Sequence, residues 1–341
     1  MCNKHSELSI ARGRFGSRLK DGAAHVSDHA RWSRRDFMSG MTAAVGGSFM
    51  LGGTPVSAFG RSHLFEKLRS IDSDRILVLV QLNGGNDGLN TVVPVDDSLY
   101  YNARPGLAIL KNSTIQIEDG VGLHPSFVDL ESIYGSGDMG VVHSVGYPSP
   151  DLSHFRSTDI WLSGSSSDEV QTTGWPGRYL DKVYPNFETE PPEKPLAVQI
   201  GGLSSMVFQG PSNYMGMSLA SVELFSQLAQ SGVVYDESSV PSTTYGTEME
   251  FVRSIANDSY QYASAIQDAA AAGTNSLEYP ANNPLADNLA VVAQLIRGDL
   301  GSKIYIVSLG GFDTHANQAT QHSTLLRYIS ESVSAFMTDI D

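Results

Sequence analysis

The stretch "KIYIVSLGGFDTH", residues 303–315, decides the fold class. Its first seven residues are mostly apolar, which predicts a strand buried on both faces, and two glycines follow. Asp313 and His315 then stand on either side of Thr314. A turn needs only the glycines, so the carboxylate and the imidazole indicate metal ligation or acid–base chemistry just beyond the end of a strand.

Working outward, the sequence alternates such apolar runs with stretches of helical periodicity. Residues 75–88, 139–147 and 195–202 predict three more strands, each leading into a turn or loop. Helical spacing predicts helices over 124–137, 151–164, 174–184, 248–273 and 283–301, and from 318 onward. This alternation predicts an α/β fold, a three-layer α/β/α sandwich around a mostly parallel sheet. Polar loops at 186–195, 209–217 and 236–246 predict insertions that cap the active face.

Residues 1–58 have the features of an export signal rather than of a folded domain. "SRRDFM" places two arginines, Arg34 and Arg35, before a mildly apolar stretch that ends in "PVSA". A basic region, a short apolar region and a small-residue cleavage pattern in this order predict a twin-arginine signal peptide with a long polar lead. The domain division is then 1–58 signal, 59–74 linker and 75–341 α/β domain, with a periplasmic or secreted product.

Composition excludes several classes of partner. The formal net charge is −15, which disfavours nucleic acid and anionic membrane surfaces. No unbroken run of 18 apolar residues occurs, so we expect no transmembrane segment in the mature chain. The single cysteine, Cys2, lies in the signal segment, so a metal would need Asp, His, Glu, Asn or hydroxyl ligands. The sequence identifies no protein partner.

Four groups of polar residues follow predicted strands, where open α/β sheets bind their ligands. In "NGGNDG", Asn86 and Asp87 stand at the mouth of the first strand, although the same letters also suit a plain tight turn. The motif fits neither a dinucleotide-binding nor a Walker loop. In "YPSPDLSHFRS", Ser149 and Ser153 are candidate nucleophiles beside His154, at a helix N-terminus that suits an anion. Ordinary helix capping is the alternative for both serines.

The remaining two groups allow the same pair of interpretations. Arg178, in "GWPGRYLD", can pair with an anionic substrate or can be a packed structural arginine. Asp313 and His315 can ligate Zn, Mn or Fe, or can cap the following helix and occupy its first turn. His124 is expected to cap the helix that it precedes, and His143 to be a core histidine within a strand.

Together these stretches resemble an uncharacterised family called domain of unknown function 1501. The matching pieces are the twin-arginine leader and, within 77–318 and in the family's order, "VQLNGGNDGLNTVVP", "LHPSF", "SHFRSTDIWLSG", "GWPGRYL" and "LGGFDTHANQ". That family is similar to alkaline-phosphatase-like and sulfatase-like hydrolases. The resemblance implies two-metal hydrolysis of a small phosphate or sulfate ester, with Asp87, Asp313 and His315 on divalent metals and Ser153 or Ser149 as nucleophile.

The sequence departs from this pattern at its end. Family members continue into another strand and a "TDHG"-like motif, which this sequence lacks. Its last apolar residues, from Ile329 to Met337, are still in helical register without a stop signal, so we expect a fragment or a degenerate copy. Two alternatives to the hydrolase therefore stay open: a non-catalytic periplasmic binding or scaffold protein on the same fold, and a metal-free serine hydrolase.

Overall fold

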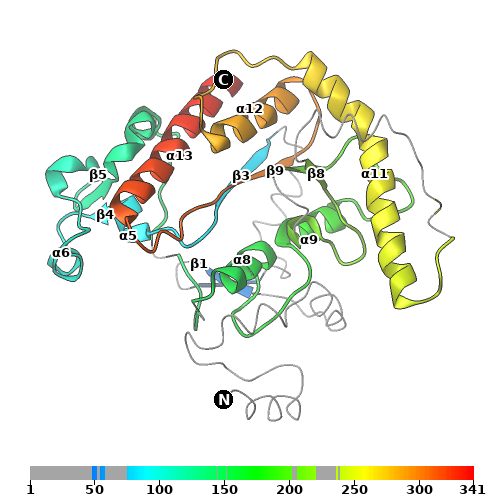
Figure 1. Ribbon diagram of the computed structural model, residues 1–341, viewed down its shortest axis with the longest axis horizontal. Helices are drawn as coiled ribbons and strands as arrows, with labels where there is room; N and C mark the ends of the chain where they lie inside the picture. Colours follow the sequence, from blue (N-terminus) through cyan, green and yellow to red (C-terminus); the bar gives the residue numbers. More distant parts are fainter. Residues whose placement is uncertain are drawn as a thin grey trace, which may run out of the picture. The chain divides into compact units, whose positions relative to one another are not determined.

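A computed structural model describes the sheet and the helices that surround it (Figure 1). The predicted linker and most of the predicted signal, including its arginine pair, lie outside the described residues. Within residues 1–58, the short strands β1 (Ser48–Leu51) and β2 (Thr54–Ser57) pair antiparallel. The described residues belong to one compact unit, Gly46–Asp341, and comprise 48–51, 54–57, 75–143, 145–150, 152–201, 206–219, 236 and 239–341.

Four parallel strands form the central sheet. Its order is β3 (Leu77–Leu82), β9 (Ile304–Leu309), β7 (Ala197–Ile200) and β8 (Met217–Leu219). Every neighbouring pair in this order is parallel, so the α/β class and the mostly parallel sheet are confirmed. The predicted strands at 75–88, 195–202 and 303–309 are β3, β7 and β9. Strand β8 begins at the end of the predicted 209–217 loop.

Side chains of the sheet alternate between two apolar clusters, because successive residues of a strand point to opposite faces. Tyr305, Val307 and Leu309 join one cluster, to which helices α11, α12 and α13 contribute. Ile304 and Ile306 join the other, with Leu162 of α8 and Leu180 of α9. Figure 1 shows α12 and α13 on one side of the sheet and α8 and α9 on the other. The bounds are α8 His154–Ser163, α9 Trp175–Val183, α11 Thr244–Ala272, α12 Pro284–Arg297 and α13 Gln318–Ile340.

A second, antiparallel sheet was not predicted. It has the order β4 (Val92–Pro94), β6 (Val121–Leu123), β5 (Ile115–Glu118), and none of its strands exceeds four residues. Short helical segments accompany it: α5 Gly88–Thr91, α6 Ser98–Ala103 and η1 Lys111–Ser113. The predicted helix at 124–137 follows, as a 3₁₀ segment η2 (Pro125–Leu130) and then α7 (Glu131–Ser136). One further 3₁₀ turn, η3, spans Met206–Phe208.

The predicted strand at 139–147 is wrong. Its described residues form no strand, and Val142 and Val145 are 75% and 77% exposed. His143 is exposed as well, so it is not a core histidine. The apolar residues of this segment have the composition of a buried strand, but among the described residues no strand pairs with the segment. As to membranes, none of the helices described is both long and apolar enough to cross one.

Candidate functional site

The site begins where two neighbouring parallel strands end. Because β3 and β9 are paired and parallel, the turns that follow them lie side by side at one edge of the sheet. Backbone hydrogen bonds join these turns: the Asn83 amide donates to the Leu309 carbonyl at 2.9 Å, and the Phe312 amide donates to the Asn83 carbonyl at 3.1 Å. The "NGGNDG" and "GGFDTH" stretches are therefore brought together, as their predicted places at strand ends required.

Three side chains converge beyond this edge. One carboxylate oxygen of Asp313 lies 2.8 Å from Nε2 of His315 and 3.3 Å from Nε2 of His154, the first residue of α8. We call His154, Asp313 and His315 the His–Asp–His cluster. Their side chains are 46%, 45% and 81% exposed, so solutes can reach them. The structure thus unites the predicted pair Asp313 and His315 with the predicted catalytic His154.

The two imidazoles govern the charge of Asp313. Partial burial raises the pKa of this carboxyl, but the hydrogen bond and charge of His315, together with His154, outweigh it and the pKa is lowered. Asp313 is therefore an anion at neutral pH. A carboxylate between two imidazoles can orient both rings and can accept a proton or a cation between them.

The two predicted serine nucleophiles flank this cluster in the sequence. Ser153 is the N-cap of α8, and its hydroxyl accepts a hydrogen bond from the Arg156 amide at 3.4 Å. Ser149 lies in an exposed bend with a φ of 53°. The capping alternative is thus realised for Ser153, which also lies directly before His154.

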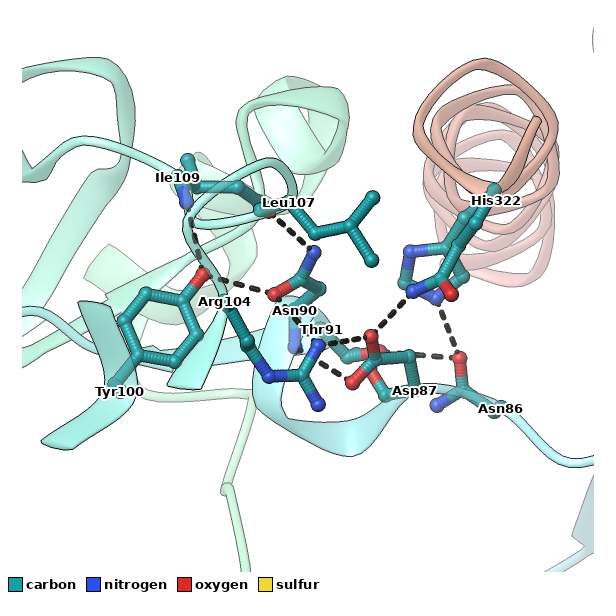
Figure 2. A network of polar contacts seen from close by, with 10 residues as sticks. Asn86, Asp87, Asn90, Thr91, Tyr100, Arg104, Leu107, Ile109 and His322 are labelled. Carbon is teal, nitrogen blue, oxygen red and sulfur yellow. Dashed lines mark hydrogen bonds and ion pairs between the residues drawn. The ribbon is translucent and has the colours of Figure 1, made fainter. Parts of the chain in front are cut away.

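Asp87 and Asn86 are engaged by other side chains, in a polar network with Asn90, Arg104 and His322 (Figure 2). Asp87 caps α5 by accepting from the Asn90 amide, pairs with Arg104 at 2.5 Å and accepts from Gln318. Burial raises the pKa of Asp87, but the hydrogen bond and charge of Arg104 reverse this and lower it. Among the described contacts, Asp87 is thus held by a cationic side chain, in contrast to its predicted role as a metal ligand.

Asn86 meets a histidine that sequence reasoning missed. Nε2 of His322, on α13, donates to the side-chain oxygen of Asn86 at 2.8 Å, and Thr91 donates to the same oxygen at 3.1 Å. In Figure 2 the Asn86 side chain is directed at this histidine. His322 is buried on the same face as Leu326. This four-residue spacing is the only sequence signal that could have placed it toward the interior.

A second buried histidine lies against His322. The ring of His124 packs edge-on at 5.8 Å between centroids, and its Nδ1 accepts from the Ser126 amide at 3.0 Å. The predicted capping role of His124 is therefore confirmed. Burial and the charge of His322 lower the pKa of His124 to about 4, and burial also lowers the pKa of His322. Both rings are consequently neutral at pH 7.

Arg178 is buried, and its side chain binds the segment that precedes α9 and the end of α8. Its guanidinium donates to the Ser163 carbonyl at 2.5 Å and to the carbonyl and hydroxyl of Thr173 at 2.6 and 2.9 Å. These contacts match the structural alternative for Arg178 rather than a substrate contact. The eight predicted site residues thus fall into three groups. Asp313, His315 and His154 form the cluster, with Ser153 and Ser149 near it in the sequence. Asn86 and Asp87 belong to the polar network, and Arg178 is buried against the backbone of other segments.

The donor types of the His–Asp–His cluster suit Zn or Mn, since two imidazole nitrogens and a carboxylate oxygen are frequent ligands of both. As placed, the residues that the structure describes form no group of three His, Cys, Asp or Glu that could hold a metal ion. A cation would therefore require the three side chains to rearrange around it. Compared with protein-family models, curated proteins and solved structures, the chain finds no match.

Proposed function

We propose that the chain is an exported, metal-dependent, hydrolase-like protein that acts on a phosphate or sulfate ester. The observation that carries this proposal is the contact of two imidazoles with one oxygen of Asp313, at 2.8 and 3.3 Å, beyond the ends of adjacent parallel strands. Open α/β sheets bind their ligands at such ends. The proposal includes the three-layer, alkaline-phosphatase-like arrangement that the sequence resemblance implies, which the two apolar faces of the sheet support.

In this proposal the His–Asp–His cluster binds the cation and α8 receives the anionic ester. Nε2 of His315 and Nε2 of His154 lie 2.8 and 3.3 Å from one oxygen of Asp313, so after rearrangement of the three side chains these atoms would hold the cation. When bound, a divalent cation would supply Lewis-acid polarisation of the ester. The ten-residue α8 begins at His154, and its free amides and dipole favour an anion there.

The nucleophile in this proposal is Ser153, with Ser149 as the second choice. Ser153 directly precedes His154 and holds the N-cap of α8, so its hydroxyl lies where that helix would receive an anion. Asp87 is left out of the proposed metal set because Arg104 and Gln318 occupy its carboxylate. Asn86 and Arg178 are left out of substrate binding because both are engaged by internal contacts.

The experiment compares Asp313→Asn with Asp299→Asn in the full-length protein. Asp299 is a matched control because its side chain is 96% exposed and its φ of 55° is readily adopted by asparagine. We expect Asp313→Asn to lower zinc affinity and p-nitrophenyl phosphate or sulfate hydrolysis by roughly 100-fold, and Asp299→Asn to leave both unchanged. Isothermal titration calorimetry and absorbance assays measure the two quantities.

Three other outcomes have distinct meanings. A wild-type protein that binds no zinc or manganese, and whose hydrolysis is unaffected by a chelator, would contradict the proposal. Cation binding without hydrolysis of either ester would favour the non-catalytic binding protein. Hydrolysis that survives chelation but is lost in Ser153→Ala would favour the metal-free serine hydrolase.

A further inference from the structure

The two glycines of "NGGNDG" lie against both segments that carry the His–Asp–His cluster. Gly84 and Gly85 have φ values of 108° and 83°, which residues with a side chain rarely adopt. A Cβ on Gly84 would lie 2.6 Å from the backbone nitrogen of Asp313. A Cβ on Gly85 would lie 2.4 Å from Cε1 and 2.9 Å from Nδ1 of His154. The turn therefore lies directly against Asp313 and His154 of the cluster.

We propose that Gly85 is a positioning residue of the cluster: the absence of a side chain there lets the His154 imidazole lie against the turn and reach Asp313. The ring presents its Cε1–Nδ1 edge to Gly85, while its Nε2 lies 3.3 Å from the Asp313 carboxylate. A methyl group at position 85 would have to move Cε1 by about 1 Å to restore ordinary contact. Such a displacement is large compared with the tolerance of a ligand set.

The turn cannot retreat to make room, because both of its ends are held. On one side, β3 is paired along its length with β9. On the other side, Asn86 receives a hydrogen bond from His322 at 2.8 Å, and Asp87 pairs with Arg104 at 2.5 Å. The imidazole is the free end of a side chain that is 46% exposed. The ring of His154, rather than the backbone, is therefore the part that moves.

This difference separates the two glycines as experimental targets. An alanine at position 84 meets backbone, so Gly84→Ala would disturb the joined strand ends and the fold with them. For an alanine at position 85 the three nearest atoms all belong to the imidazole of His154. Gly85→Ala therefore keeps the fold while it displaces one member of the cluster. Its effect on cation binding rests on the proposed function, whereas its effect on the His154 ring does not.

Gly137→Ala is the matched control. Gly137 has a φ of 86°, nearly that of Gly85, and a Cβ there would meet nothing within 4 Å. Both variants introduce the same methyl group at a similar positive φ, and only the one at position 85 meets His154. The experiment records ¹H–¹³C spectra of the histidine Cε1 groups in the full-length protein, with the His154 signal assigned by its loss in His154→Ala. Zinc affinity is measured on the same samples.

We expect the His154 Cε1 signal to shift in Gly85→Ala and to stay in place in Gly137→Ala. Zinc affinity should fall roughly 10-fold or more in Gly85→Ala alone, and adding Gly85→Ala to His154→Ala should cause no further loss. An unshifted His154 signal in Gly85→Ala, or equal affinity losses in the two glycine variants, would overturn the assignment. If the wild-type protein binds no zinc and cleaves no ester, the proposed function fails, and the spectra still decide the role of Gly85.

Discussion

At the scale of single residues, Asp87 shows how one letter can support two interpretations. An Asp after "NGGN" suited both a turn and a metal site, and the sequence could not choose between them. The residues that decide are remote: Arg104 is 17 positions away and Gln318 is 231 positions away. Asp313 and His315 are neighbours in the sequence, so their contact was predictable. The contact of His154 with Asp313 depends on how α8 packs, so it was not predictable from the sequence.

The buried histidine pair gives the clearest prediction at this scale. The pKa of His124 is lowered from 6.5 to about 4 by burial and by His322, so the folded state binds its proton less readily than the unfolded state. The resulting stability is complete above pH 6.5 and is lost as the pH falls toward 4. We expect the free energy of unfolding to fall by up to about 3 kcal/mol across this range, measured by urea titration at a series of pH values.

His124→Asn is the variant that tests this, since the asparagine side-chain oxygen can accept the capping hydrogen bond in place of Nδ1 but does not titrate. Its free energy of unfolding should depend less steeply on pH between 6.5 and 4 than that of the wild type. His143→Asn, at an exposed position, should leave the wild-type slope intact. Equal slopes in all three proteins would mean that protonation of His124 does not limit stability.

At the scale of elements, periodicity was informative where a segment was long or buried on both faces. Strands β3, β7 and β9 contribute side chains to both apolar clusters. Their sequences are therefore continuous apolar runs, which is why they were predicted. The strands β4, β5 and β6 have three or four residues each, too few for a period to be visible. At 139–147 the sequence has an apolar run that predicted a strand, but its valines Val142 and Val145 are exposed and the prediction was wrong. Local composition cannot report whether a partner strand exists.

The end of α13 is fixed by one buried carboxylate, which carries the second prediction. Asp339 is 1% exposed and accepts from the amide and hydroxyl of Ser276 at 2.6 and 2.8 Å and from Tyr279 at 3.0 Å. Nη1 of Arg297, from α12, lies 3.8 Å away. Burial raises the pKa of Asp339, but the two Ser276 bonds and the other partners lower it overall. The carboxylate thus ties α13 to the segment between α11 and α12.

Removing this carboxylate should leave several buried groups without an acceptor. We expect Asp339→Ala to lower the free energy of unfolding by about 3 kcal/mol, since each stranded polar group costs about 1–3 kcal/mol. Asp341→Ala, two residues further along and exposed, should change it by less than about 0.5 kcal/mol. Chemical denaturation of both variants measures the difference. A small effect of Asp339→Ala would show that water replaces the carboxylate at no cost.

At the scale of the whole molecule, the sequence predicts the class of the sheet but not its order. Strand β9 lies between β3 and β7, although residues 77 and 304, which pair in register, are separated by most of the domain. Helical and strand periodicities report which face of an element is apolar, and they carry no information on which elements become neighbours. The central place of β9 is nevertheless what sets Asp313 and His315 beside the turn of β3. The site follows from the sheet order rather than from any single motif.

The order of the sheet can be tested with two identical substitutions. Val307 of β9 and Val80 of β3 are paired in register, and both contribute to the same apolar cluster. Val307 is fully buried in a strand with neighbours on both sides, whereas Val80 lies half-buried in a strand at the edge. A cavity at Val307 is enclosed, while one at Val80 can be reached by solvent or closed by movement of the edge. We expect unfolding free energies lower by about 2–3 kcal/mol for Val307→Ala and about 1 kcal/mol for Val80→Ala, measured by urea denaturation. Equal losses would contradict the placement of Val80 in a less enclosed strand than Val307.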